Sequence, residues 1–487
     1  MKLANKLYYI PGLIVALFAG YAVFYTTLNN AYQYGSTFYD SAEFATIIWR
    51  SGLKLYMGPV FGGYIYTTHA STINYIPSLF SYLWTGDRLN YYALVYALVY
   101  AAMMITAYIL LLPLLPRWWG ACFAALGTAA LFCGQIIFDG SWEMRSDFMS
   151  PLFMMLAFRA WQLRRYRMAA LWFTLNNMVR EDLGIMILVP VILLTAIQYY
   201  HLRLSNPALA KEKLRWGIGI AVLCLVWELV TIYIQKHYFQ LYDLLQDQYY
   251  DRDHPFAHLS WELIEDRLFY LLNHAAGIWL PLFMVGVAAL LFCDWEMLVG
   301  ALAFMPYITG MFFSKSEMSA QFGSYKAFLF PLCVMWPAII ACGKPIHLQR
   351  HYALIQAVVL ICGLAYIKPW FPDAAMHRWL PQPLTANAQV YRDFGEKQLA
   401  EEGAMNDSTR ATHAILALYP YQFQESGKSW ILGVQPQDFD KVDTLIWFEN
   451  DREQSLVDKV LKAGEFDIKA IPDTKIRVAH RRVASGN

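Results

Sequence analysis

The sequence is poor in charge. Only 15% of its 487 residues are charged, whereas 58% are hydrophobic, and an ordinary soluble domain carries about 25% charged residues. The formal net charge is +1, so the charge balance gives no support for binding to nucleic acid. These shortages disfavour a soluble globular protein and a nucleic-acid-binding protein.

The sequence also lacks a cysteine framework. Its seven cysteines all fall in apolar runs and have no zinc-ligand spacing, which predicts small buried apolar side chains without disulfides. They are Cys122, Cys133, Cys224, Cys293, Cys333, Cys342 and Cys362. No internal repeat stands out, and this disfavours transporter folds that are built on repeats.

Long apolar runs dominate what is present. A bilayer-spanning helix needs roughly 17–25 apolar residues, and about eleven segments approach this length. They are approximately 8–28, 89–113, 119–138, 148–163, 168–180, 183–200, 216–235, 277–293, 296–313, 325–342 and 351–367. The fifth segment is too short to span unaided, and a broken helix is expected around residue 180. The first segment, 8–28, is predicted to be a membrane anchor that is kept in the protein, because no small-residue cleavage site follows it.

Basic residues predict the orientation. If the N-terminus lies in the cytoplasm, the inner loops are strongly basic. The acids assigned to these loops are Glu212, Asp294 and Glu296. The inner cations are Lys2, Lys6, Arg117, Arg164, Arg165, Arg167, Arg203, Lys211, Lys213, Arg215, Lys344 and Arg350. Eleven crossings place the C-terminus outside. Residues 41–49 and 71–84 of the first outer loop predict two interfacial helices, and a third is expected around 260–272.

The chain changes from mainly apolar to mainly polar after residue 367. Residues 1–367 form the predicted transmembrane domain, and residues 368–487 form a predicted extracytoplasmic α/β domain. In this tail, strand-like "ILALYPYQF", "DTLIWFEN" and "KIRVAH" alternate with helix-like "NAQVYRDFGEKQLAEEG" and "EQSLVDKVLKAG". A stabilising or acceptor-guiding role is favoured for it over independent catalysis.

Two carboxylates and a histidine stand out in the first outer loop. In "STFYDSAEF", Asp40 and Glu43 have the spacing of a helix capping box, a purely structural explanation. The functional alternative makes Asp40 a general base, or makes the pair a metal site. His69 follows in "YTTHASTINYIP", where a solvated or hydrogen-bonded side chain competes with a proton-transfer, phosphate-binding or metal-binding role.

Further charges gather in the other outer loops. "DGSWEMRSDF" holds Asp139, Glu143, Arg145 and Asp147, which form either a solvated turn with internal ion pairs or a phosphate site at Arg145. "NNMVREDLGI" places Arg180, Glu181 and Asp182 within an apolar run, where charges are costly and are therefore functional candidates. Lys326 either snorkels from a span or supplies another cation for a lipid phosphate.

The order of "FYDSAEF", "THASTINYIPSLFSYLW", "MRSDFMSPLFMMLAF", "VREDLGI" and "FGSYKAFLFPL" resembles a bacterial family of integral membrane proteins classed only as a domain of unknown function. "AMNDSTRATHAILALYPYQF" and "DTLIWFEN" resemble its outer domain. That family is similar to the GT-C superfamily of membrane glycosyltransferases. The family often has His at the position of Arg145, and Lys is commoner than Arg at the position of Arg180.

The resemblance implies a GT-C-like enzyme of the bacterial inner membrane. It implies transfer, with inversion, of a sugar from a polyprenyl-phosphate donor to an envelope glycan, lipid or protein on the outer side. Asp40 is then the general base, with Glu43 as helper. His69, Arg145, Arg180, Glu181, Asp182 and Lys326 are candidates for binding phosphate or sugar. Asp40, Glu43 and His69 could ligate Mg²⁺ or Mn²⁺, or act without metal.

Two other functions fit the same features. A transporter or flippase of a lipid-linked saccharide would use these cations without breaking a bond. A non-catalytic envelope assembly protein would act through its outer domain. In that last case Asp40, His69 and Arg180 need not share a site, whereas catalytic groups must lie within reach of the reacting atoms.

Overall fold

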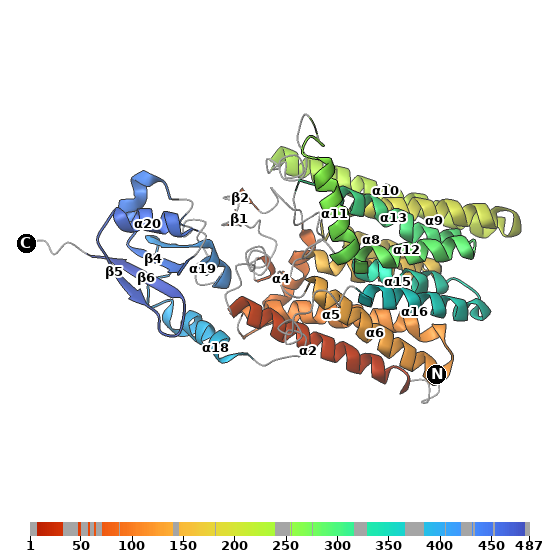
Figure 1. Cartoon of the computed structure of the whole chain (residues 1–487), viewed down its shortest axis with the longest axis horizontal. Helices are drawn as coiled ribbons and strands as arrows, with labels where there is room; N and C mark the ends of the chain where they lie inside the picture. Colours follow the sequence, from red (N-terminus) through yellow and green to blue (C-terminus); the bar gives the residue numbers. More distant parts are fainter. Residues whose placement is uncertain are drawn as a thin grey trace, which may run out of the picture.

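The computed structural model describes most of the chain. The described residues are 7–32, 47–49, 57–58, 63–64, 71–86, 88–139, 146–180, 182–238, 254, 256–274, 276–315, 329–365, 384–404, 406–419, 431, 434–450 and 453–482. All structural statements below refer to these residues. A helical bundle forms the N-terminal part, and a smaller sheet-containing part follows it (Figure 1).

Each of the eleven predicted segments corresponds to a helix. The helices are α2 (Ile10–Tyr32), α5 (Arg88–Leu111), α6 (Arg117–Asp139), α7 (Ser150–Gln162), α8 (Tyr166–Asn177), α9 (Leu183–Ser205), α10 (Pro207–Tyr238), α12 (Ala276–Leu291), α13 (Trp295–Phe312), α15 (Phe330–Ala341) and α16 (Gln349–Ala365). Among the described residues, α2, α5, α9, α10 and α13 contain stretches long and apolar enough to cross a membrane. This is a polytopic helical membrane protein, and the number of crossings stays a prediction.

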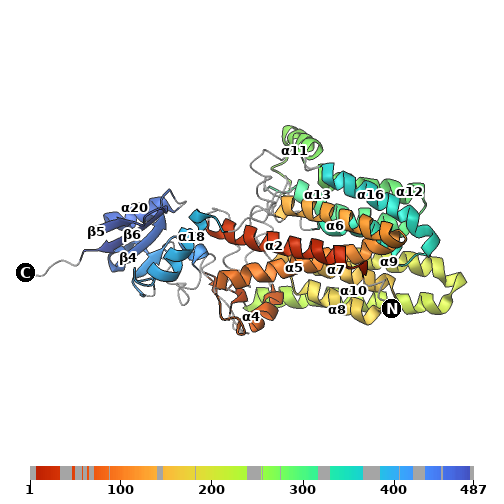
Figure 2. The ribbon, with the colours of Figure 1, turned by 90° about the horizontal axis from the view of Figure 1, so that it is seen from below.

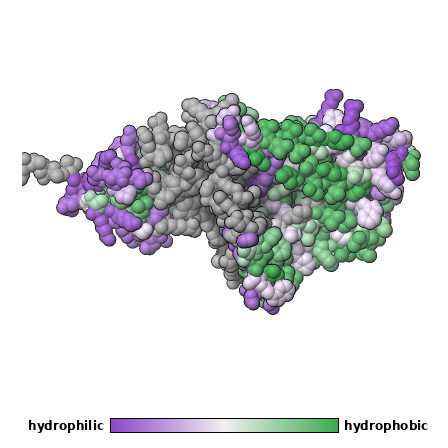
Figure 3. Space-filling model, turned by 90° about the horizontal axis from the view of Figure 1, so that it is seen from above, coloured by the Kyte–Doolittle hydropathy of each residue, from purple (hydrophilic) through white to green (hydrophobic). Residues whose placement is uncertain are grey.

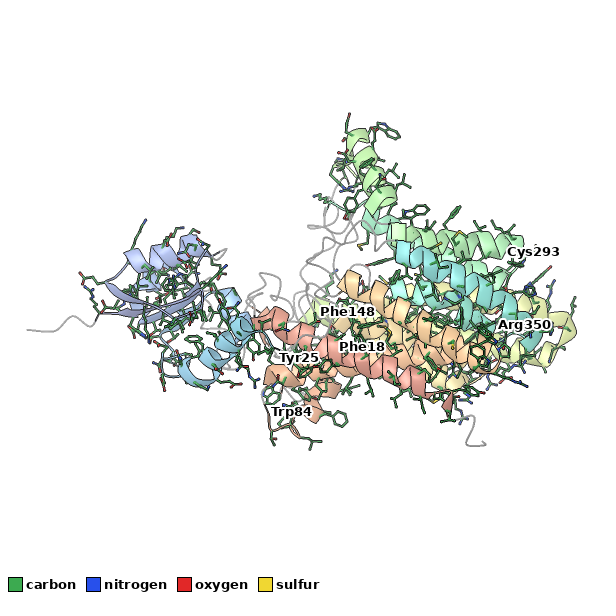
Figure 4. The ribbon with its side chains drawn as sticks, turned by 60° about the horizontal axis from the view of Figure 1, so that its bottom comes forward. Phe18, Tyr25, Trp84, Phe148, Cys293 and Arg350 are labelled. Atoms are coloured by element: carbon green, nitrogen blue, oxygen red, sulfur yellow. The ribbon has the colours of Figure 1, made fainter. Side chains whose placement is uncertain are left out.

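The bundle has two distinct ends. Short connections join α5 to α6, α7 to α8, α9 to α10, α12 to α13 and α15 to α16 at the end that carries the N-terminus. We call this the inner end, after the predicted orientation, and the opposite end the outer end. Figure 4 shows Phe148 toward the outer end and Cys293 and Arg350 at the inner end.

α2 and α5 are in close contact with each other. Large buried side chains recur at every fourth position of α5, where they form one stripe, as expected for residues that share a helical face. They are Tyr92, Tyr96, Tyr100, Met104 and Tyr108. Gly20 of α2 faces this helix, and a Cβ there would lie 3.2 Å from the carbonyl oxygen of Ala97. A larger residue at position 20 would therefore force the two helices apart.

The outside of the bundle is apolar. Figure 3 shows hydrophobic residues over most of the visible helical body, with hydrophilic residues on the sheet-containing part. α10 alone exposes Ile218, Val222, Leu229 and Val230. Such a continuous apolar surface suits contact with lipid. The prediction that the cysteines are buried is wrong for Cys122 and Cys293, which are exposed. An apolar run in a membrane protein can face lipid and need not be buried in protein.

Short helices lie outside the main bundle. The predicted helix 71–84 is present as η2 (Thr72–Asn74) and α4 (Tyr75–Ser81), and the predicted third outer helix is α11 (Trp261–His274). Of the predicted helix 41–49, the structure describes only residues 47–49. β1 (Met57–Gly58) and β2 (Gly63–Tyr64) pair antiparallel. The remaining short turns of helix are η3 (Leu112–Leu114), η4 (Ser146–Met149) and η7 (Ile346–Leu348).

The C-terminal part contains a four-stranded sheet of order β3-β4-β6-β5. Its strands are β3 (Thr409–Ala411), β4 (Thr444–Phe448), β5 (Phe466–Ala470) and β6 (Ile476–Arg481). β3 and β4 are parallel, and the other neighbours are antiparallel. Its helices are α18 (Ala386–Asp393), the π-helix η9 (Phe394–Gln398), α19 (His413–Leu418), η11 (Pro436–Lys441) and α20 (Gln454–Lys462). The Asn29 side chain accepts a 3.1 Å hydrogen bond from the Thr385 N–H and joins α18 to α2 (Figure 2).

One predicted strand of the tail is wrong. "ILALYPYQF" begins as helix α19, and the strand precedes it at Thr409–Ala411. Alanine and leucine favour a helix, and a helix must end before Pro420. The strands in "DTLIWFEN" and "KIRVAH" and the helix in "EQSLVDKVLKAG" are confirmed.

Glu402 connects the neighbouring antiparallel strands β5 and β6. Its carboxylate accepts hydrogen bonds from Lys469 on β5, at 2.6 Å, and from His480 on β6, at 2.9 Å. Burial alone raises the pKa of Glu402, but these two partners outweigh burial and hold the pKa below its ordinary value of 4.5. A depressed pKa means that the contacts stabilise the fold above about pH 4.5 and that this contribution is lost as the pH falls through the folded-state pKa.

We therefore expect Glu402→Gln to speed amide exchange in β5 and β6 at pH 7. The difference from the unmodified protein should shrink steadily below pH 4.5, the ordinary carboxyl value. The measurement is the amide hydrogen-exchange rate of β5 and β6, corrected for the intrinsic pH dependence of exchange. Glu449→Gln is the control, because its ion pair with Arg477 is exposed and should contribute little. If the variant and the unmodified protein differed in exchange rate equally at pH 7 and well below pH 4.5, the ionised Glu402 carboxylate would not be the stabilising group.

Candidate functional site

Two of the eight predicted site residues lie in the described part of the chain. Arg180 and Asp182 occupy the turn between α8 and α9, at the outer end. The other six predicted residues, Asp40, Glu43, His69, Arg145, Glu181 and Lys326, lie outside the described residues. The site can therefore be built upward from Arg180.

Arg180 lies at the break between the short helix α8 and the long helix α9. α8 ends at Asn177 and α9 begins at Leu183, as the interrupted apolar pattern predicts. Arg180 is only 8% exposed. Its guanidinium donates two hydrogen bonds to the Asp182 carboxylate, one of them 2.7 Å from Nη2 to Oδ2. A third donor, Nη1, lies 3.3 Å from Oδ1 of Asp147.

The two carboxylates have different surroundings. Asp147 belongs to η4 and is 1% exposed, whereas the Asp182 side chain is 42% exposed. A buried charge is tolerated only when it is paired, so the guanidinium provides a counter-charge that Asp147 requires. Asp147 is therefore not part of a solvated hairpin. The burial of Asp147 could not be predicted from the sequence, because Asp147 shares a polar stretch with three other charged residues.

The first outer loop reaches the same turn. The Ile73 N–H donates a 2.8 Å hydrogen bond to the carbonyl oxygen of Met178. Ser146, beside Asp147, donates to the hydroxyl of Ser71 over 3.1 Å. Three segments far apart in the sequence, around residues 71–74, 146–149 and 178–182, thus meet at the outer end.

Polar side chains continue from this junction into the bundle. Ser150, in the first turn of α7, donates a 2.7 Å hydrogen bond to the side chain of Asn176. Asn74 is fully buried, and neither polar atom of its carboxamide has a hydrogen-bond partner within the described residues. Buried amides are normally satisfied by protein or water. The outer end is thus a polar region in an otherwise apolar bundle.

A buried carboxylate of α10 lies next to the start of α9. Glu228 is buried, and a Cβ on Gly184 would lie 3.0 Å from its Oε2 and 2.9 Å from the carbonyl oxygen of Cys224. Glycine at position 184 therefore allows the first turn of α9 to approach α10. This contact fixes the end of the turn that holds Arg180. Sequence reasoning missed Glu228, because it is a lone charge in a long apolar run.

The Arg180 guanidinium has the donor geometry that an anion-binding site requires. A guanidinium presents a planar fork of donors that matches phosphate as well as carboxylate, and the exposed Asp182 is the partner that a phosphate could replace. The described residues contain no group of three or more His, Cys, Asp or Glu that could hold a metal. The predicted metal ligands Asp40, Glu43 and His69 lie outside that part of the chain.

No family model matches the chain, and no curated protein matches it by sequence. Among solved structures, it is similar to the crystal structure of ArnT from Cupriavidus metallidurans bound to undecaprenyl phosphate. The TM-score is 0.53 at 13% sequence identity, and the match covers 99% of this chain and 98% of ArnT. The chain therefore resembles ArnT in fold. The match spans both the helical bundle and the C-terminal sheet.

We expect Asp147→Ala to destabilise the protein strongly. It removes one of the two carboxylates that accept from a buried guanidinium, and a hydrogen bond to a charged group is worth about 1.5–3 kcal/mol. Thermal unfolding in detergent should show a clear fall in Tm. Asp438→Ala is the control, since its ion pair with Lys441 is exposed and should be worth at most about 1 kcal/mol. Equal, small shifts for both variants would refute the role of Asp147.

Proposed function

We propose that this protein is a membrane glycosyltransferase that moves a sugar from a polyprenyl-phosphate donor to an acceptor on the extracytoplasmic side. The observation that carries the proposal is the buried Arg180 at the junction of three outer segments, in a fold similar to that of ArnT. The ArnT crystal structure is described as bound to undecaprenyl phosphate. A lipid phosphate is thus a suitable ligand for the guanidinium.

The positions of the remaining candidates in the sequence support one shared site. His69 precedes Ser71 by two residues, Arg145 directly precedes Ser146, and Glu181 lies between Arg180 and Asp182. Ser71, Ser146 and Arg180 all belong to the junction. Asp40 and Glu43 belong to the same predicted outer loop as His69. This sequence proximity favours a common catalytic site over separate functions.

The proposed reaction is a single displacement with inversion. The acceptor hydroxyl transfers its proton to the Asp40 carboxylate while its oxygen forms a bond to the anomeric carbon. The bond between that carbon and the donor phosphate breaks, through an oxocarbenium-like state similar to that of glycosidases. Arg180 stabilises the charge that grows on the departing polyprenyl phosphate. Arg145 and Lys326 are further candidates for this task.

The proposed location is the bacterial inner membrane, with the N-terminus in the cytoplasm. The C-terminal sheet then lies on the extracytoplasmic side, beside the outer end of α2, which it contacts through Thr385. The acceptor is an envelope glycan, lipid or protein. This placement brings a folded polar domain next to the site, where it can guide an acceptor.

Asp40→Asn should abolish sugar transfer and leave the protein folded. The amide cannot accept the acceptor's proton, but it keeps the size and most hydrogen bonds of the carboxylate. Transfer from a radiolabelled polyprenyl-phosphate sugar in detergent measures the loss, and an unchanged Tm shows intact folding. Near-normal transfer by Asp40→Asn would refute Asp40 as the base.

The same assay separates the proposal from its rivals. Transport needs two compartments, so a transporter or flippase would leave the labelled donor chemically intact in detergent. A non-catalytic assembly protein would do the same. Breakage of the bond between sugar and phosphate in detergent therefore supports an enzyme.

Arg180→Ala should reduce kcat by about 100- to 1,000-fold, the usual effect of removing one group that stabilises transition-state charge. Arg180→Lys should retain more activity, because it keeps the positive charge but loses the fork of donors. The control is Arg203→Ala, an exposed arginine in the last turn of α9 at the inner end, which should leave kcat unchanged. Unaltered kcat in Arg180→Ala would exclude Arg180 from the reaction.

A further inference from the structure

The inner end of the bundle contains a second polar network. Lys213 of α10 is only 6% exposed and donates a 2.6 Å hydrogen bond to Oε1 of Gln198 on α9. Trp161 of α7 donates to the same oxygen over 3.0 Å. The amide nitrogen of Gln198 donates to the Glu296 carboxylate of α13 over 2.7 Å, and Gln162 donates to it over 3.3 Å.

The network continues to the connection between α15 and α16. Lys344 lies 3.1 Å from Oε1 of Glu296 and 3.5 Å from Oδ2 of Asp294. The Tyr352 hydroxyl of α16 donates to the same Asp294 carboxylate. Asp294 also caps α13, accepting from the backbone N–H groups of Glu296 and Met297. Two lysines and two carboxylates therefore balance one another.

This network is far from Arg180. α7 runs from Ser150, near the junction, to Gln162, in the network, and a helix rises 1.5 Å per residue, so the two ends of α7 are about 18 Å apart. Figure 4 shows this separation, with Phe148 and Cys293 at opposite ends of the bundle. The network is therefore no part of the candidate site.

The network connects two groups of helices. α7, α9 and α10 provide Trp161, Gln162, Gln198 and Lys213, whereas α13, α16 and the connection after α15 provide the acids, Lys344 and Tyr352. Separating the groups would leave charged, largely buried side chains without partners, which is costly.

We propose that this network locks the inner end closed throughout turnover, so that donor and acceptor reach the site only from the outer end. The proposal rests on the proposed transferase function. An alternating-access transporter must open both ends in turn, often by rocking one group of helices against another. A transferase whose substrates both arrive at the outer end has no such need.

The end of α7 and the connection after α15 offer a direct test. A Cβ on Gly343 would lie 3.5 Å from the Cβ of Gln162, and the Cβ atoms of a disulfide are about 3.5–4.5 Å apart. Gln162→Cys with Gly343→Cys should thus form a disulfide between the two groups of helices. Cys342→Ala in the same chain prevents pairing with the neighbouring native thiol. The same chain with only Gln162→Cys is the control.

Transfer of the radiolabelled sugar is measured before and after oxidation, with mass spectrometry to show the cross-link. Oxidation should change the rate of the double-cysteine protein by less than about two-fold, a barrier change of less than about 0.5 kcal/mol. A loss of ten-fold or more on oxidation, restored by reductant and absent from the control, would overturn the lock. Absence of transfer by the unmodified protein in the same assay would instead refute the proposed function.

The contribution of the network is tested by a second variant. Glu296→Ala removes the carboxylate that both groups of helices share, so the inner end should open more often. A cysteine at position 162, in a chain that also carries Cys122→Ala, Cys293→Ala and Cys342→Ala to remove the exposed and neighbouring native thiols, should then react with a water-soluble maleimide at least about ten-fold faster. An unchanged labelling rate would show that the network does not hold this end closed.

Discussion

The outer end of the bundle depends on the burial of one guanidinium. Arg180 is stable in an apolar bundle only because two carboxylates accept its hydrogen bonds. This need explains why η4 places Asp147 inside the bundle. It also explains the break between α8 and α9, since a turn brings Arg180 and Asp182 to one point. The hydrogen bond between Ile73 and Met178 then attaches the first outer loop to that turn.

The two polar regions have opposite characters. At the outer end, the Arg180 guanidinium is shared with Asp182, whose side chain is substantially exposed, and loop segments supply most of the contacts. At the inner end, rigid helices supply almost every partner, and Glu296 accepts from three side chains. A charge paired with an exposed group can exchange it for a ligand at little cost. A charge enclosed by helices cannot, because its partners would have to move with the helices.

Hydrophobic patterning predicted the helices well and the polar contacts poorly. All eleven apolar segments contain a helix, and the pattern around residue 180 indicated the break between α8 and α9. Local patterning misplaced one strand, because alanine and leucine in α19 fit a helix better than a sheet. The inner network was not predicted, because Lys213 and Lys344 look like ordinary cations of inner loops. Only tertiary packing shows that Glu296 draws them together.

The two carboxylates around position 180 also favour arginine over lysine there. A lysine at this position would supply one ammonium group, which is a compact point charge. Here the guanidinium uses three nitrogens toward two carboxylates on different segments. A lysine would have to hold both acids with one nitrogen and could not match a planar carboxylate with two parallel hydrogen bonds. In the proposed function, an arginine that bound a phosphate in place of Asp182 would still hold Asp147 through its third nitrogen, so the buried carboxylate would stay paired.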